Sequence, residues 1–160
     1  MAKDGVNWKR IRRKHQTVTQ ETKEGRSSPL GATLSPEGTN FSVYSKHAAA
    51  VELLLFDSVD DARPARVISI DPASSRTYHY WHVFVPGVTA GQIYGYRVSG
   101  KFDPSTGMRF DSSKVLLDPY GRAVVFSQHY SREAARKEGR QCRDGAKERG
   151  RRSAFVRLGR

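Results

Sequence analysis

Residues 78–87, Y-H-Y-W-H-V-F-V-P-G, decide the fold class of this chain. Large apolar and aromatic side chains alternate along this stretch with a period of two, which is typical of a β-strand, and Pro86-Gly87 ends it. One face of the strand carries His79, Trp81, Val83 and Val85, and the other carries Tyr78, Tyr80, His82 and Phe84. The first set is the candidate core face, and the second set is the candidate for contact with a ligand or another domain.

Four further stretches between Pro29 and Val125 show strand patterns: 40–44, 51–56, 66–71 and 93–98. Gly, Pro, Asp and Ser clusters separate them, and no helical period intervenes, so the sequence predicts an all-β sandwich. The strand at 51–56 is apolar on both faces, and its second face therefore needs cover from another part of the protein.

Charge divides the 160 residues into three parts. Residues 1–27 carry eight Lys/Arg against three Asp/Glu, residues 131–160 carry eleven against four, and the stretch between them carries nine of each. The sequence thus predicts a flexible basic arm at 1–27, a β-sandwich at 28–126 and a linker with an irregular basic tail at 127–160. The neutral middle argues against nucleic acid as the partner, despite the net charge of +12.

Composition excludes several classes of site. No run of about 18 apolar residues exists, and no signal-peptide pattern opens the chain, so we expect a cytoplasmic protein with no membrane partner. Cys142 is the only cysteine, and the five histidines have no metal-ligand spacing. We therefore expect no metal and no cofactor.

Six ordered blocks carry a family resemblance. They are 28–33 (SPLGAT), 38–45 (GTNFSVYS), 50–57 (AVELLLFD), 81–87 (WHVFVPG), 94–98 (YGYRV) and 114–120 (KVLLDPY). In order and spacing they resemble the opening of isoamylase-type glycogen debranching enzymes of the α-amylase superfamily, over residues 27–139. The resemblance implies an early-set, immunoglobulin-like sandwich, classed as a family 48 carbohydrate-binding module.

The family's reaction is implied by the resemblance alone. It is hydrolysis of α-1,6 branch linkages in glycogen or amylopectin by two carboxylates on a (β/α)₈ barrel. A barrel needs about 250 residues, so we expect the chain to lack it, to contain no catalytic residue and to be inactive by itself. The resemblance further implies α-glucan as a ligand and the missing barrel as the natural packing partner.

The tail departs from the family after Gly139. From Arg140 onward the family continuation can be read one base out of register, and we interpret residues 140–160 as a frameshifted segment. The fold is then expected to be complete near residue 125. Apolar side chains left bare by the missing barrel are expected to be Leu54, Phe56, Phe84, Leu116 and Leu117.

The candidate site is the face formed by Tyr78, Tyr80, His82 and Phe84. Exposed rings stack on the apolar faces of sugars, so this face is predicted to bind glucan or to contact the barrel. Trp81, Tyr94 and Tyr96 are predicted to be core rings instead. Two other functions stay open, a stand-alone glucan-targeting subunit and a small basic nucleic-acid-binding protein.

Overall fold

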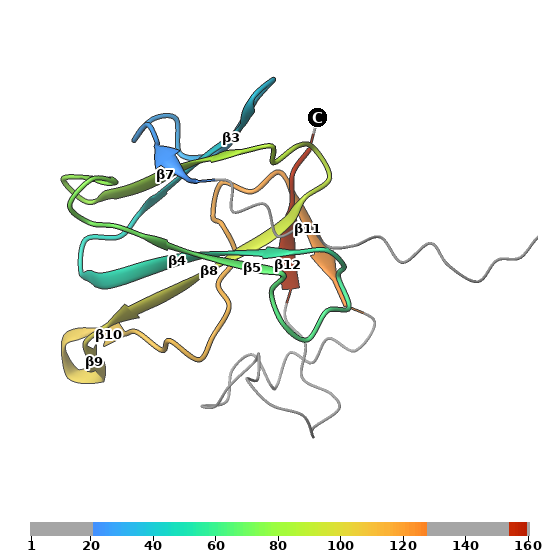
Figure 1. Ribbon diagram of the computed structural model, residues 1–160. Coiled ribbons are helices and arrows are strands. Elements are labelled where there is room, and N and C mark those ends of the chain that lie inside the picture. Colours follow the sequence, from blue (N-terminus) through green and yellow to red (C-terminus); the bar gives the residue numbers. More distant parts are fainter. Residues whose placement is uncertain (1–20, 128–153, 160) are drawn as a thin grey trace, which may run out of the picture.

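Alternating apolar residues build two antiparallel sheets in the computed structural model, which describes residues 21–127 and 154–159 (Figure 1). The first sheet has the order β1–β7–β3–β2, with β6 also paired to β7. Its strands are β1 (Lys23–Glu24), β2 (Gly31–Ser35), β3 (Gly38–Tyr44), β6 (Arg76–Thr77) and β7 (Tyr80–Pro86).

The second sheet has the order β11–β12–β8–β4–β5. Its strands are β4 (Ala48–Phe56), β5 (Arg66–Ile70), β8 (Ile93–Gly100), β11 (Ala123–Phe126) and β12 (Ala154–Arg157). A separate hairpin pairs β9 (Phe102–Asp103) with β10 (Met108–Arg109) around a short 3₁₀ turn at Pro104–Thr106. The predicted all-β, immunoglobulin-like sandwich is confirmed.

The core lies between the two sheets, where their inward residues meet. Phe41 and Trp81 from the first sheet and Leu53 from the second are fully buried. The phenol rings of Tyr94 and Tyr96 also point inward, and Tyr94 packs edge-on against Phe41 with ring centroids 5.0 Å apart. The prediction that Trp81, Tyr94 and Tyr96 are core rings is therefore correct.

A second apolar cluster covers the outer face of β4. Leu54 and Phe56 pack there with Ile93, Val115 and Phe155, and the rings of Phe56 and Phe155 have centroids 4.3 Å apart. Val115 reaches the sheet because residue 95 is glycine, since a Cβ there would lie 2.7 Å from the Val115 side chain. The chain itself thus supplies the cover that the two-sided strand needs.

This cluster corrects two expectations. Leu54 and Phe56 are buried by the chain's own residues, whereas Leu116 and Leu117 are 44% and 38% exposed, as expected. Phe84 is half-buried.

The fold is also not complete near residue 125, because β12 lies between β8 and β11 in the second sheet. Phe155, Val156 and Leu158 of the tail are buried in the two clusters. The interpretation of residues 140–160 as frameshifted stays a prediction, with 140–153 outside the described residues. Whatever the origin of the tail, Phe155, Val156 and Leu158 supply apolar side chains to the core, while Arg157 is exposed.

Truncating Phe155 tests whether β12 belongs to the fold. Phe155→Ala is expected to lower the free energy of unfolding by about 3–5 kcal/mol, because a buried ring is replaced by a cavity. Phe155→Leu, which keeps most of the apolar volume, is expected to lose less. Urea unfolding of the full chain, followed by tryptophan fluorescence, measures both changes.

The matched control is Phe102→Ala, since the Phe102 side chain is 56% exposed. It is expected to change stability by no more than about 0.5 kcal/mol. Equal, small losses for Phe155→Ala and Phe102→Ala would show that β12 does not contribute to the core.

Candidate functional site

Four aromatic side chains meet at one end of the first sheet, where β3 ends and β7 begins. Tyr44 and Tyr80 are paired residues on these strands, and their rings lie 5.4 Å apart at 67°. The His79 ring contacts Tyr44 edge-on at 6.0 Å and lies 3.8 Å from the Tyr78 ring. We call Tyr44, Tyr78, His79 and Tyr80 the ring cluster.

The ring cluster is open to solvent. Tyr78 is 78% exposed and Tyr44 is 47% exposed, while His79 and Tyr80 are half-buried. Tyr78 also has φ +57°, in the left-handed region that residues other than glycine seldom adopt. This conformation occurs in the turn between β6 and β7, where the Tyr78 side chain is exposed. Strained, exposed residues of this kind concentrate at functional sites.

The part of the predicted face around His82 is covered and cannot contact a sugar. Residues 25–28, which follow β1, cross the outer face of the first sheet, where the Asn40 amide exchanges two hydrogen bonds with the backbone of Arg26. The Ser42 hydroxyl donates to the Ser27 carbonyl oxygen at 2.8 Å. His82 lies on the same face and is only 2% exposed, with its Nε2 2.9 Å from the Thr77 hydroxyl.

Of the four predicted site residues, the structure therefore brings together Tyr78 and Tyr80. His82 is buried, and half-buried Phe84 lies four residues beyond Tyr80 along β7, opposite Lys23 of β1. Burial lowers the pKa of His82, and the nearby Glu24 carboxylate opposes this effect only in part. His82 is thus a neutral, structural ring near pH 7.

Sequence reasoning missed Tyr44 and His79. Tyr44 was detectable, because strand alternation places it on the face opposite Phe41 and Val43. His79 was assigned to the core face with Trp81, but β7 starts at Tyr80, and the left-handed turn at Tyr78 breaks the alternation before that point. Desolvation, followed by the positive charges of Lys46 and Arg76, lowers the pKa of His79.

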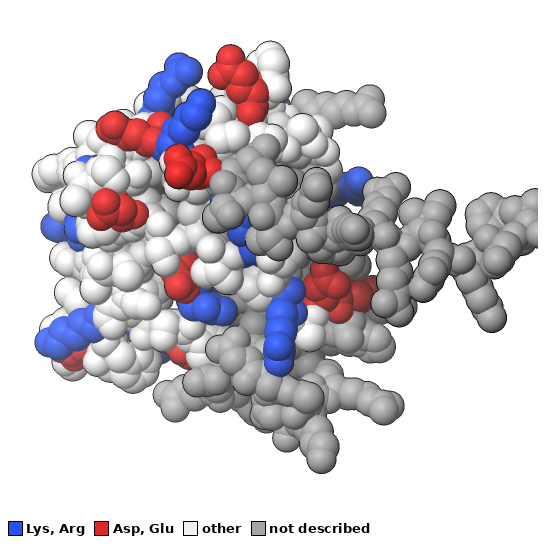
Figure 2. Space-filling model, in the orientation of Figure 1, with Lys and Arg blue, Asp and Glu red and all other residues white. Residues whose placement is uncertain are grey.

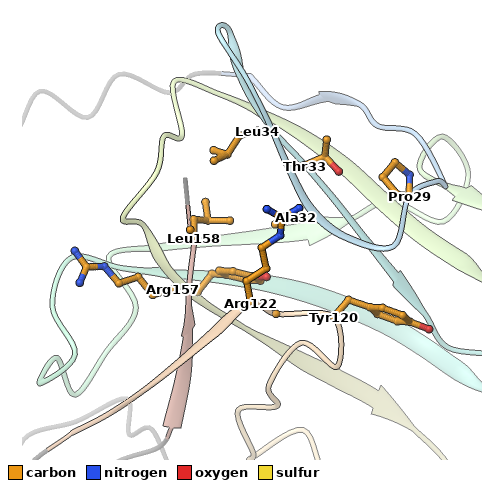
Figure 3. Close-up of a pocket in the computed structure, with 11 residues that line it drawn as sticks. Pro29, Ala32, Thr33, Leu34, Tyr120, Arg122, Arg157 and Leu158 are labelled. Atoms are coloured by element: carbon orange, nitrogen blue, oxygen red, sulfur yellow. The ribbon is translucent and has the colours of Figure 1, made fainter.

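A pocket lies away from the ring cluster, between β2 and the end of β12 (Figure 3). Its volume is about 270 Å³, and Pro29, Leu34 and Leu158 line it. Figure 3 shows Arg122 extending toward β2, while the guanidinium of Arg157 points away from the other lining residues. The pocket therefore presents one cation rather than a pair.

A buried carboxylate holds the loop beside this pocket. Asp118 is 4% exposed and accepts 2.8 Å hydrogen bonds from the Tyr94 hydroxyl and from the backbone N–H of Tyr120. Desolvation raises the pKa of Asp118, and the two hydrogen bonds oppose this effect. Asp118 anchors the loop of residues 115–121 to the core, which is a structural task.

Figure 2 shows acidic and basic side chains mixed over one face of the molecule, with no continuous basic patch among the coloured residues. The described ranges contain twelve Lys/Arg and eleven Asp/Glu. Within these ranges no three His, Cys, Asp or Glu side chains gather as metal ligands would. No helix in the described part is long and apolar enough to cross a membrane.

The two packed antiparallel sheets define a small immunoglobulin-like module, and this module has exposed aromatic rings at one sheet end. The family model described as carbohydrate-binding module 48 (isoamylase N-terminal domain) matches residues 29–121. The chain belongs to this family.

Curated relatives agree with this assignment. Isoamylase 1, chloroplastic, from Arabidopsis thaliana is 44% identical over 105 residues, and glycogen debranching enzyme from Serratia proteamaculans is 48% identical over 104. These matches cover 64% and 65% of the chain but only 13% and 15% of the relatives. The chain thus spans a small part of their length.

Solved structures agree on the fold. The catalytic module of the glycogen-degrading pneumococcal virulence factor SpuA matches with a TM-score of 0.54 at 15% identity, over 85% of this chain and 17% of that one. The Group B Streptococcus pullulanase SAP matches with a TM-score of 0.53 at 16% identity, over 84% and 15%.

Replacing Asp118 tests its role as an anchor. Asp118→Ala is expected to lower the free energy of unfolding by about 1–3 kcal/mol, because the buried Tyr94 hydroxyl loses its acceptor. Asp118→Asn keeps the shape and one acceptor oxygen, and is expected to lose less. Urea unfolding at pH 7 distinguishes the two variants, and an equal effect of both would contradict the anchoring role.

Because the pKa of Asp118 is raised, the difference in stability between Asp118→Asn and the native chain is expected to depend on pH. The folded state holds the Asp118 proton more tightly than the unfolded state does, so ionisation costs stability as pH rises from about 4 through the folded pKa. The stability of Asp118→Asn relative to the native chain is therefore expected to increase with pH over that window. A constant difference between pH 4 and pH 7 would mean that the Asp118 pKa is unshifted.

Proposed function

We propose that this chain is the accessory β-sandwich module of an α-glucan debranching enzyme and that its ring cluster binds α-glucan. Family membership supports the first part, since the relatives are named as isoamylases and glycogen debranching enzymes. The catalytic reaction, hydrolysis of α-1,6 linkages, is proposed for a partner domain rather than for this chain.

The observation that carries the binding proposal is the open contact among Tyr44, Tyr78, His79 and Tyr80. Flat rings offer apolar area to the C–H faces of glucose, while the tyrosine hydroxyls accept and donate hydrogen bonds to the sugar hydroxyls. The Tyr44 and Tyr80 rings are inclined at 67°. Successive units of an α-1,4-linked chain also turn relative to each other, so inclined rings suit two neighbouring units.

Packing against a catalytic domain is proposed for a different surface, the loop at 116–120. Leu116, Leu117 and Tyr120 are all exposed there, the last at 54%. Leu116 also lines an apolar pocket of about 330 Å³ with Met108 and Phe110. Exposed apolar patches of this kind are typical of protein–protein contacts.

Two alternative functions are distinguished by the glucan-binding experiment described below. A stand-alone glucan-targeting subunit would bind glucan without a catalytic partner. A nucleic-acid-binding protein would use the basic segments, but the near balance of charge in the described ranges disfavours it. A cytoplasmic location is proposed with the function, although the Arabidopsis relative is named as chloroplastic.

Binding of maltoheptaose to the full chain tests the proposal by isothermal titration calorimetry. The full chain is used because β12 belongs to the second sheet. Tyr80→Ala and Tyr44→Ala are each expected to remove about 1–2 kcal/mol, a loss of about 5- to 30-fold in affinity, because stacking area is lost. Single-stranded DNA at physiological salt is expected not to compete.

The matched control is Tyr120→Ala, an exposed tyrosine outside the ring cluster. It is expected to leave glucan affinity unchanged. Absence of maltoheptaose binding, or equal losses for Tyr120→Ala and Tyr80→Ala, would overturn the proposal that the ring cluster is the binding site.

A further inference from the structure

Two cations, Lys46 and Arg76, border the ring cluster without an ion pair to any described residue, although the Arg76 guanidinium also lies 4.7 Å from the centroid of the Trp81 ring. Lys46 follows Ser45, whose backbone N–H donates to the His79 carbonyl oxygen at 2.9 Å. Arg76 lies on β6, and its Nε donates to the Tyr78 carbonyl oxygen at 3.1 Å. The Arg76 side chain is therefore held at the backbone of Tyr78, and Lys46 follows a residue that is bonded to the backbone of His79.

Neither cation is neutralised by the described part of the chain. Lys46 is exposed and Arg76 is half-buried, and neither forms an ion pair with a described residue. Asp71, the acidic residue nearest to Arg76 in sequence, accepts hydrogen bonds from the Ala73 backbone and the Ser74 hydroxyl. Among the described residues, no carboxylate forms an ion pair with either cation at this end of the sheet.

The positive charges of Lys46 and Arg76 also affect the pKa of the His79 ring. Desolvation lowers its pKa first, and the charges of Lys46, Arg76 and His47 lower it further. His79 is therefore neutral near pH 7 and offers a ring face, while Lys46 and Arg76 supply the charge.

We infer that the ring cluster, together with Lys46 and Arg76, binds an α-glucan that carries a phosphate monoester. The rings take the apolar faces of glucose units, and the two cations take the phosphate oxygens. Hydrogen bonds from Lys and Arg to phosphate are charge-assisted and stronger than neutral ones. This inference rests on the proposed function, because the same rings hold the sugar in both.

Stacking beside cations is also how single-stranded nucleic acid is bound. Glucan is favoured here because the chain belongs to a carbohydrate-binding family and because the described ranges contain almost equal numbers of acidic and basic residues. A nucleic acid, whose every residue carries a phosphate, needs a longer basic track than two side chains provide.

The test compares maltoheptaose with maltoheptaose bearing one 6-phosphate, using the full chain at low and at physiological salt. The phosphate is expected to raise affinity about tenfold at low salt and less at physiological salt, because partly exposed charges are screened. Lys46→Gln is expected to remove most of this gain and to leave maltoheptaose affinity unchanged. Tyr80→Ala weakens binding of both glucans.

The matched control is Lys23→Gln, which removes a positive charge from β1 of the same sheet, opposite Phe84. It is expected to preserve the gain from phosphate, whereas an equal loss in Lys23→Gln and Lys46→Gln would overturn the inference in favour of general charge attraction. Inorganic phosphate and a seven-nucleotide DNA strand complete the comparison, and both are expected to bind less tightly than the phosphorylated glucan.

The outcomes separate this inference from the proposed function. Equal affinity for the two glucans overturns the inference and leaves the function standing. Absence of binding to either glucan overturns both. Tighter binding of the DNA strand overturns both in favour of nucleic acid.

Discussion

Burial of both faces of β4 is the constraint on which the rest of the structure depends. Val51, Leu53 and Leu55 require an opposing sheet, and Leu54 and Phe56 require a second cover. The first need brings the two sheets together. The second need is met by Val115 from the loop after the β9–β10 hairpin and by Phe155 from the tail. A strand of one sheet thus fixes the positions of segments more than 50 residues away.

This arrangement limits where a ligand can bind. The inner faces of both sheets form the core, the outer face of β4 is covered, and residues 25–28 cross the outer face of the other sheet. The ring cluster remains open at the sheet end, because the turn at Tyr78 carries the chain out of the sandwich before β7 begins. The rings of Tyr78 and His79 therefore lie in the turn before β7 and not on its core face.

Alternation along the sequence predicted the all-β class, the core rings and the two-sided character of β4, since these follow from local period and side-chain type. It failed where the backbone leaves the regular strand. The left-handed Tyr78 displaced His79 from the core face. His82 is buried beside Thr77, on the face that residues 25–28 cross, and no local pattern contains these contacts. The role of 154–158 was also missed, because strand partners distant in sequence leave no signal in a short apolar run.

We propose that this sandwich, whose sheets are covered by its own chain, presents one sugar-binding surface, at the ring cluster. Mapping the NMR chemical-shift changes of the full chain during a maltoheptaose titration tests it most directly. We expect the largest changes at Tyr44, Tyr78, His79 and Tyr80, and no change in the signals of Phe155 and Arg122. Changes centred on the pocket beside Arg122, or on the outer face of β4, would contradict it.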